Sequence, residues 1–170
     1  MDTQIKEAYP ICIENNCLWK SDLEQIGIKD EDGTKCIQVA DCSLAHFIIE
    51  NVNKKELGIL AIDKCIFDDQ SGHKKCDFAF FDEEMFVFVE IKDTYKRRPT
   101  HKKQAKLQLA ATIEHFLSHL NFEGYQLQAI ISWRFMPTRP VASTAMQEAR
   151  VAFLENYNVH LKEGNKFILA

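Results

Sequence analysis

Residues 76–92 read CDFAFFDEEMFVFVEIK, and this stretch predicts a β-hairpin around which the rest of the chain is arranged. Two runs rich in aromatic and β-branched residues flank an acidic triplet at 82–84, which is the composition of two strands joined by a turn. We expect Phe81 to face Phe86 across this turn. Because side chains alternate between the two faces of a strand, this register decides which residues of the hairpin lie together.

The polar residues near the open end of the hairpin are Asp77, Glu90 and Lys92. In the expected register Asp77 lies opposite Glu90, at roughly 5 Å, and Lys92 shares a strand face with Glu90. Two carboxylates beside an ammonium suit a hard divalent cation such as Mg²⁺ or Mn²⁺. Such a cation acidifies a bound water and neutralises charge on a phosphodiester. Lys92 would stabilise the negative charge that develops during the reaction.

An Asp, a hairpin and then Glu-X-Lys at 90–92 together resemble the catalytic signature of the PD-(D/E)XK superfamily, the restriction-endonuclease-like nucleases. Cys76 stands where that signature has a proline. The resemblance covers residues 43–133 and implies a metal-dependent nuclease, with Asp77 and the Glu as metal ligands and the Lys completing the catalytic set. The alternative is a solvated strand end, because Glu-X-Lys is common on exposed strands.

Two further residues are candidates through the same resemblance. An acidic residue of the first core helix often joins the site in this superfamily, and Glu50 falls on the helix that we expect there. A solvated glutamate is the alternative reading of Glu50. In RecB-like members a Gln-x-x-x-Tyr motif lies on the helix after the hairpin; Gln108 matches its Gln, while Thr112 stands in the tyrosine position.

The other segments predict an α/β protein. Ser43 is a plausible N-cap, and apolar residues recur later at a 3.6-residue period. The expected elements are a helix at 43–53, a strand at 57–67, the hairpin, a helix at 100–120, a strand at 126–135, a helix at 141–157 and a second hairpin at 159–169 that turns at 164–165. We expect a three-layer-like α/β sandwich around a central mixed sheet. The resemblance implies an αβββαβ core.

Charge is distributed unevenly along the chain. The net charge is −4, from 21 Lys and Arg against 25 Asp and Glu, so bulk charge does not attract nucleic acid. The segment 92–106 reverses this sign, and Arg97, Arg98, Lys102 and Lys106 are the expected phosphate-binding residues. We expect a nucleic-acid partner to contact this segment. Nothing in the sequence separates DNA from RNA.

The chain of 170 residues fits one domain, with an accessory region at 1–42, the core at 43–133 and a C-terminal helix and hairpin at 134–170. No apolar run is long enough to span a bilayer, and the first ten residues lack the apolar core of a signal peptide. We therefore expect a cytoplasmic protein without membrane contact. The six cysteines contain no Cys-x-x-Cys pair, which favours buried thiols over disulfides or zinc ligands.

A second hypothesis comes from a different class of protein. The same scaffold can serve a non-catalytic interaction protein, such as a toxin-neutralising or regulatory partner, because fold does not determine function. The small size and the acidic net charge leave room for this role. An enzyme predicts that the three polar residues of the hairpin share a site. An interaction protein predicts an exposed apolar or acidic patch elsewhere.

Overall fold

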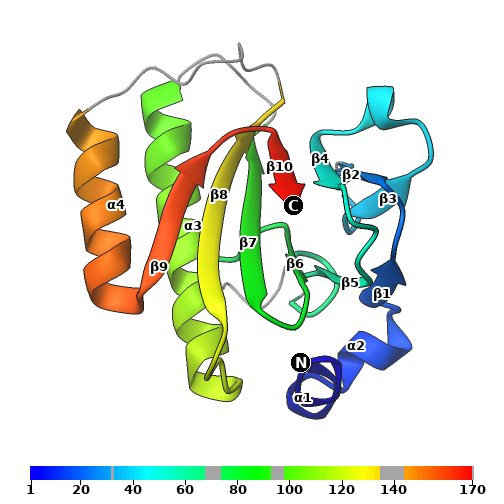
Figure 1. The fold of residues 1–170 in the computed structure, drawn as a ribbon. Helices are drawn as coiled ribbons and strands as arrows, with labels where there is room; N and C mark the ends of the chain where they lie inside the picture. Colours follow the sequence, from blue (N-terminus) through cyan, green and yellow to red (C-terminus); the bar gives the residue numbers. More distant parts are fainter. Residues whose placement is uncertain (32, 68–73, 93–97, 135–143, 170) are drawn as a thin grey trace.

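The computed structural model describes residues 1–31, 33–67, 74–92, 98–134 and 144–169. It is a mixed α/β structure in which helices, a large sheet and a smaller sheet form successive layers (Figure 1). The helices are α1 (Asp2–Ala8), α2 (Ile11–Glu14), α3 (Arg98–His119) and α4 (Thr144–Tyr157), with a short 3-10 turn η1 (Cys42–Leu44). None of the helices in these ranges is long and apolar enough to cross a membrane.

The large sheet contains the predicted hairpin. Its six strands, in spatial order, are β1 (Leu18–Ser21), β5 (Leu57–Ala61), β6 (Phe78–Phe81), β7 (Met85–Lys92), β8 (Gln126–Trp133) and β9 (Val159–Glu163). Neighbours from β1 to β7 are antiparallel, whereas β7, β8 and β9 are parallel. The smaller sheet has the order β10 (Lys166–Leu169), β4 (Phe47–Asn51), β2 (Gln25–Lys29) and β3 (Ile37–Val39).

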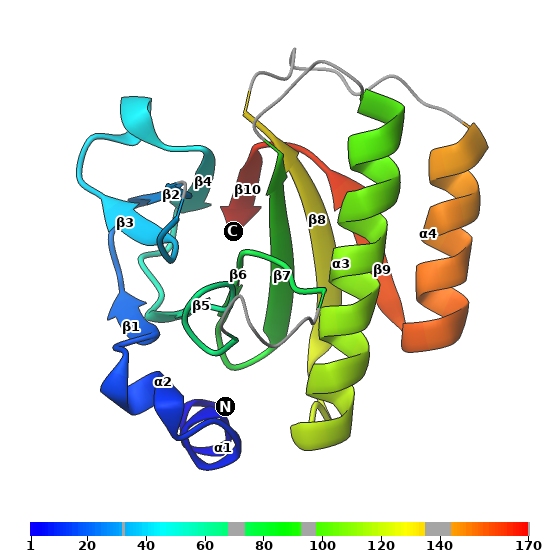
Figure 2. The same ribbon diagram turned by 180° about the vertical axis from the view of Figure 1, so that it is seen from behind.

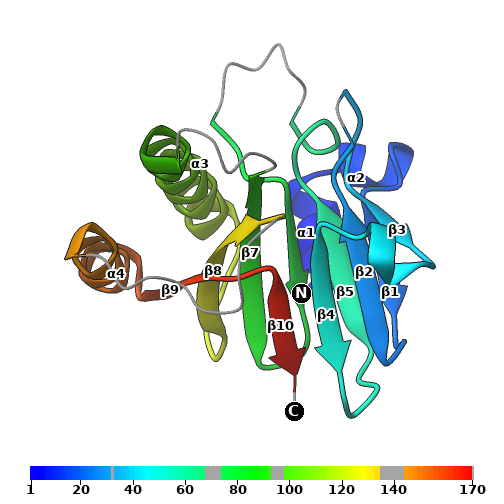
Figure 3. The ribbon, with the colours of Figure 1, turned by 90° about the horizontal axis from the view of Figure 1, so that it is seen from above.

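Alternation along β7 builds two cores, one on each face of the large sheet. Phe86 and Phe88 pack on the helix side with residues of α3 such as Phe116. Val87 and Val89 pack on the opposite side, against the smaller sheet. Figure 2 shows α3 and α4 over one face, and Figure 3 shows these two helices on one side of β7 and the smaller sheet on the other. Both faces of β7 are therefore covered, which explains its near-continuous apolar sequence.

The predicted hairpin is confirmed, including its register, since Phe81 pairs with Phe86. The predicted helix at 100–120 is also confirmed as α3. The strand predicted at 126–135 ends at Trp133 and the helix predicted at 141–157 begins at Thr144; residues 135 and 141–143 lie outside the described ranges. The strand predicted at 57–67 stops at Ala61.

The predicted helix at 43–53 is wrong. The chain makes the short turn η1, which Asp41 rather than Ser43 caps, because the Asp41 carboxylate accepts a hydrogen bond from the Ser43 main-chain N–H at 2.9 Å. Strand β4 follows. It buries every second side chain completely or nearly so, namely Phe47, Ile49 and Asn51. This period of two is that of a strand with one face in the core, and β-branched residues favour it over a helix.

The predicted hairpin at 159–169 is also wrong, because its two strands belong to different sheets. Strand β9 adds to the large sheet in parallel with β8, whereas β10 pairs in parallel with β4. The main-chain N–H of Gly164 donates to Ile131 O at 3.2 Å, and the next residue, Asn165, accepts from Ile48 N at 3.1 Å. The segment between the strands thus crosses from one sheet to the other instead of turning back on itself.

A disulfide joins Cys17 to Cys65, with the two Cα atoms 5.6 Å apart, so the prediction of free thiols is wrong for this pair. The free cysteines Cys12, Cys36 and Cys76 are buried, as expected. Cys17 and Cys65 meet because β1 pairs with β5, which the sequence separation of 48 residues does not reveal. Permanent disulfides are uncommon in the cytosol, so this bond does not favour the expected cytoplasmic location.

Candidate functional site

The hairpin register brings Asp77 and Glu90 together in the middle of the large sheet, at the start of β6 and the end of β7. The pairing of Phe81 with Phe86, continued along the ladder, places Asp77 opposite Glu90. Asp77 precedes β6, and its carboxylate Oδ2 accepts a hydrogen bond from the Ile91 main-chain N–H at 2.5 Å. This bond crosses from the start of β6 to the end of β7. It holds the Asp77 side chain beside the strand that carries Glu90.

Glu90 is a buried carboxylate with few partners. Its side chain is 1% exposed and forms an ion pair with the Lys92 ammonium. Neither carboxylate oxygen accepts a hydrogen bond of normal geometry from the described residues. Burial raises the pKa of Glu90 to about 8, although Lys92 acts in the opposite direction.

Asp77 shares this environment. It is 6% exposed, and burial raises its pKa well above the ordinary range of an aspartate. The neighbouring Glu90 carboxylate is the next largest cause, and the Asp30 carboxylate raises the pKa further. A buried carboxylate whose charged form is destabilised by burial and by neighbouring acids favours the binding of a proton or of a cation. A hard divalent cation is therefore compatible with the electrostatics of the pair.

Lys92 is held in place from helix α3. Its Nζ donates to Gln108 Oε1 at 2.8 Å, and Gln108 Nε2 donates to the main-chain oxygen of Lys75 at 3.0 Å. Gln108 therefore lies beside Lys92, at the position where the resemblance predicted a site residue. Thr112, in the tyrosine position of the motif, accepts a hydrogen bond from the Cys76 N–H at 2.8 Å. Thr112 thus holds the main chain just before β6, and Gln108 is the residue of α3 that binds the Lys92 ammonium.

Asp63 and Lys75 were not foreseen from the sequence. Asp63 follows β5, its main-chain N–H donates to Asp77 O at 3.2 Å, and its Oδ1 lies 3.2 Å from Lys75 Nζ. Asp30, just after β2 of the smaller sheet, acts electrostatically on both Asp77 and Glu90. The sequence predicted a strand at 57–67, so Asp63 was expected in the middle of a strand and not after its end. Its position as the first acid after an apolar run was the signal that could have identified it.

Glu50 lies elsewhere. It belongs to β4 of the smaller sheet, where it forms an ion pair with Lys166. Its strand partners, Gln25 on β2 and Ile168 on β10, also belong to the smaller sheet. The expectation that Glu50 reaches the site depended on the helix at 43–53, and that helix is a strand.

The basic segment is only partly described. Arg97 lies outside the described ranges, and Arg98 is the first residue of α3. Lys102 forms an ion pair with Glu163 at 2.9 Å, at the end of β9, and its side chain is 14% exposed. Lys106 lines an open groove between α3 and α4. Lys102 therefore lies against β9, and Lys106 lies beside α4.

Comparison with known proteins gives no relative from which a function could be transferred. No family model, curated protein or solved structure matches this chain. The chemistry of the site must therefore be inferred from its geometry.

The donor set at the site fits a hydrated divalent cation. Among the described residues, no group of three or more His, Cys, Asp or Glu side chains is arranged to hold a metal ion. Mg²⁺ commonly uses only one or two carboxylates and keeps several waters. Asp77 and Glu90 are two carboxylates of the hard type that such an ion prefers, and the Glu90 oxygens accept no hydrogen bond of normal geometry from the described residues. The residues thus fit Mg²⁺ or Mn²⁺ in kind and in number.

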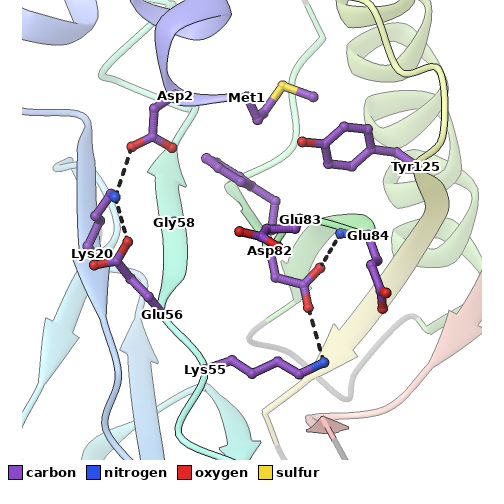
Figure 4. A pocket seen from close by; sticks show the side chains of 11 residues that line it. Met1, Asp2, Lys20, Lys55, Glu56, Gly58, Asp82, Glu83, Glu84 and Tyr125 are labelled. Carbon is purple, nitrogen blue, oxygen red and sulfur yellow. Dashed lines mark hydrogen bonds and ion pairs between the residues drawn. The ribbon is translucent and has the colours of Figure 1, made fainter.

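A separate cavity of about 540 Å³ lies at the turn of the hairpin, at the other end of β7 (Figure 4). Carboxylates outnumber lysines in its lining. The charged lining residues are Asp2, Glu56, Asp82, Glu83 and Glu84 against Lys20 and Lys55, and the Phe81 ring and Tyr125 add aromatic surface. Lys20 pairs with Asp2 and Glu56, and Lys55 with Asp82. A cavity with this charge repels phosphate, so a nucleic acid is not expected there.

Proposed function

We propose that this protein is a divalent-metal-dependent nuclease that hydrolyses phosphodiester bonds of nucleic acid. The observation that supports the proposal is the buried Glu90 carboxylate, whose one polar partner of those that the structure describes is the Lys92 ammonium, and which lies beside Asp77 at the ends of β6 and β7. A buried charge with so few partners is costly unless a ligand compensates for it. Such groups cluster at functional sites.

The arrangement of the elements supports a restriction-endonuclease-like core. Strands β5, β6 and β7 are successive and antiparallel, helix α3 follows, and β8 returns parallel to β7. The superfamily suggested by the Glu-X-Lys signature has this order of three strands, a helix and a strand. Its first helix has no counterpart at 43–53, where this chain forms η1 and β4. The proposal of membership therefore rests on the part of the chain from β5 to β8.

Each residue of the site has a defined part in the proposed reaction. Asp77 and Glu90 would hold Mg²⁺ or Mn²⁺, which supplies an acidified water and neutralises phosphate charge. Lys92 would stabilise the negative charge that develops on the phosphate oxygens. Its contact with Gln108 limits the positions that the ammonium can take. Burial of the acids keeps bulk water away, which strengthens these electrostatic interactions.

The nucleic-acid partner would approach from the end of β7 at which α3 begins. Arg97, Arg98, Lys102 and Lys106 are the residues that we propose to contact phosphates, as clustered cations in an acidic chain. Lys102 would contribute least, because it is already paired with Glu163. The substrate is proposed as a nucleic acid in general, either DNA or RNA.

A cleavage assay tests the proposal. Purified protein is incubated with supercoiled plasmid, single-stranded DNA and RNA, each with Mg²⁺, Mn²⁺ or EDTA. We expect cleavage with metal and none with EDTA, a loss of about 10²–10³ in rate for Lys92→Met, and loss of activity for Glu90→Gln. Glu50→Gln is the matched control, because it removes a carboxylate on the other sheet, and it should cleave like the wild type.

The proposal fails if no substrate is cleaved with either metal. It also fails if Lys92→Met and Glu90→Gln both cleave at the wild-type rate. Circular dichroism of each variant identifies any loss of activity that is due to unfolding.

A second candidate function is the non-catalytic interaction protein. The observation that favours it is a set of exposed apolar side chains on α3 and α4: Leu107 is 43% exposed, Val151 53% and Leu154 44%. Exposed apolar side chains on neighbouring helices are the kind of surface that protein interfaces cover. This function predicts a complex that survives Glu90→Gln and is lost on Leu154→Lys. Size-exclusion chromatography of the protein with its partner distinguishes the two functions.

A further inference from the structure

We propose that Asp63 is a positioning residue of this site, which binds the water shell of the cation held by Asp77 and Glu90. Lys75 holds the Asp63 side chain in place. This inference rests on the proposed function, since it needs a cation at the two acids. It adds a residue that neither the sequence signature nor the resemblance identifies.

The main chain places Asp63 at the strand ends that carry the site. The β5–β6 ladder ends with Ala61 opposite Phe78, and beyond it the Asp63 N–H donates to Asp77 O at 3.2 Å. Asp77 in turn lies opposite Glu90 in the β6–β7 register. The three acids therefore follow one another across the ends of three neighbouring strands. In this register Ile62 lies opposite Asp77, so Asp63 contacts Asp77 through the main chain, and its carboxylate acts electrostatically on Glu90.

Lys75 connects Asp63 to the lysine of the proposed catalytic set. Its Nζ lies 3.2 Å from Asp63 Oδ1 and donates to Phe67 O at 3.3 Å, and its side chain is 10% exposed. The main-chain oxygen of Lys75 accepts from Gln108, whose Oε1 accepts from Lys92 Nζ. A continuous series of polar contacts thus runs from Asp63 to Lys92. A change at Asp63 can reach Lys92 through these contacts, and also through Glu90, on which Asp63 acts electrostatically and which pairs with Lys92.

Two of the three carboxylates, those of Glu90 and Asp63, have buried oxygen atoms without a hydrogen bond of normal geometry from the described residues. Both oxygens of Glu90, which is 1% exposed, accept no hydrogen bond from the described residues, and Asp63 Oδ1 is likewise buried without one. Each acid has an ion pair with one lysine instead. Waters bound to a cation would supply the missing donors. After burial and the effect of Lys92, the Asp63 carboxylate is the next influence on the pKa of Glu90, which it raises.

A water-mediated role fits the geometry better than direct coordination. No three acidic, His or Cys side chains in the described ranges are arranged as a direct metal site. Mg²⁺ gives up its waters reluctantly, and these waters are strong hydrogen-bond donors. Asp63, fixed by Lys75, is therefore placed to accept hydrogen bonds from them. Loss of such an outer contact typically weakens metal binding by about 10–100-fold.

Binding of Mn²⁺ alone, measured by the electron paramagnetic resonance signal of free Mn²⁺, tests this role without substrate. We expect the wild type to bind Mn²⁺, Glu90→Gln to lose binding, and Asp63→Asn to bind about 10–100-fold more weakly. Asp63→Asn with Lys75→Gln removes both partners of the ion pair. If Asp63 contacts the water shell, this double variant stays as weak as Asp63→Asn. Glu50→Gln is the control and should bind like the wild type.

The outcomes separate this inference from the proposed function. Wild-type affinity in Asp63→Asn, or recovery of affinity in the double variant, overturns the role of Asp63, because the acid would then only neutralise Lys75. No Mn²⁺ binding by the wild type, or full binding by Glu90→Gln, overturns the metal site itself. Melting temperatures of all variants are recorded, and the charge-balanced double variant keeps the test decisive if Asp63→Asn alone is unstable.

Discussion

Glu90 shows how one residue can connect the fold to the proposed chemistry. Its carboxylate is 1% exposed, and burial raises its pKa to about 8. The ordinary pKa of a glutamate is about 4.3. At a pH between these two pKa values, the Glu90 side chain is protonated in the folded protein and ionised in the unfolded chain. The free energy of unfolding must therefore decrease as pH rises through this window, when no divalent metal is present.

The first prediction follows from this sign. In EDTA, the wild type should lose stability relative to Glu90→Gln as pH rises from about 5 to 8.5, because the glutamine carries no titrating group in the same buried place. Urea unfolding of both proteins at several pH values measures the difference. Mn²⁺ added at the upper pH should stabilise the wild type and not the variant. Parallel stability curves for the two proteins would contradict the raised pKa of Glu90.

Tyr9 allows a second prediction at the scale of one residue. Its ring stacks on Phe116 with centroids 5.2 Å apart, and its hydroxyl is buried with no hydrogen-bond partner among the described residues. Tyr9→Phe should leave stability unchanged or raise it by about 1 kcal/mol, because it removes an unsatisfied polar group. Tyr9→Ala should cost about 3–5 kcal/mol through loss of the ring. Urea denaturation decides, and a clear loss in Tyr9→Phe would mean that the hydroxyl has a partner.

At the scale of elements, the hairpin and its neighbour β5 depend on a close contact at Gly58. A Cβ atom at this position would lie 2.4 Å from the nearest atom of the Phe81 ring. This ring stacks on that of Phe86, with the ring centroids 5.2 Å apart and an angle of 3° between the ring planes. Gly58→Ala should therefore destabilise the protein by about 1–3 kcal/mol, since it forces a packed ring to move. Thermal melts measure the loss. Gly124→Ala is unsuitable as a control, because the positive φ of 84° at Gly124 would strain an alanine. Ala110→Gly on α3 is used instead, to measure the change in stability that backbone propensity alone causes.

The disulfide gives a prediction for the contact between β1 and β5. Cys17 and Cys65 are 48 residues apart, and their bond limits the freedom of the unfolded chain. Cys17→Ser with Cys65→Ser should cost about 2–5 kcal/mol of stability. A dithiol reductant should lower the melting temperature of the wild type and leave that of the double variant unchanged. Cys42→Ser is the matched control, because Cys42 is a free and partly exposed thiol.

At the scale of the whole molecule, the acidic net charge makes nucleic-acid binding depend on a local patch. The chain carries −4 overall, so bulk electrostatics oppose binding. Arg98→Glu with Lys106→Glu, in a Glu90→Gln background that cannot cleave, should weaken binding of a single-stranded oligonucleotide and flatten its dependence on salt. Fluorescence anisotropy from 50 to about 200 mM salt measures the slope.

Two other charge reversals serve as comparisons for this prediction. Lys54→Glu should leave the slope unchanged, since Lys54 is 65% exposed and outside the basic segment. Lys102→Glu should mainly destabilise the protein, because it leaves the Glu163 side chain, 1% exposed, opposite a second acid. An unchanged slope in the Arg98 and Lys106 variant would place the nucleic acid, if it binds, on another surface.

The local sequence determined the hairpin, its register and the facing of Asp77 and Glu90. A short turn between two strands leaves few possible registers, and alternation along β7 then decides which side chains share a face. The sequence also determined α3, because apolar residues that recur every 3.6 residues over a long segment form a single apolar face only in a helix. Lys92 could be named from its place on the strand face of Glu90, and Gln108 from the resemblance to the Gln-x-x-x-Tyr motif, although the contact between them could not be predicted.

Only the tertiary structure decided the parts that depend on distant segments. The segment after Ser43 forms strand β4 because it pairs with β2 on one side and with β10 on the other. Local propensity contains no information about these two partners. Strands β9 and β10 separate because each finds a better partner in a different sheet. Asp63 joins Asp77 for a similar reason, since their neighbourhood arises from β5 pairing with β6. Burial on both faces of a sheet selects such long-range pairs, and a sequence pattern of period two is the same whichever partner is chosen.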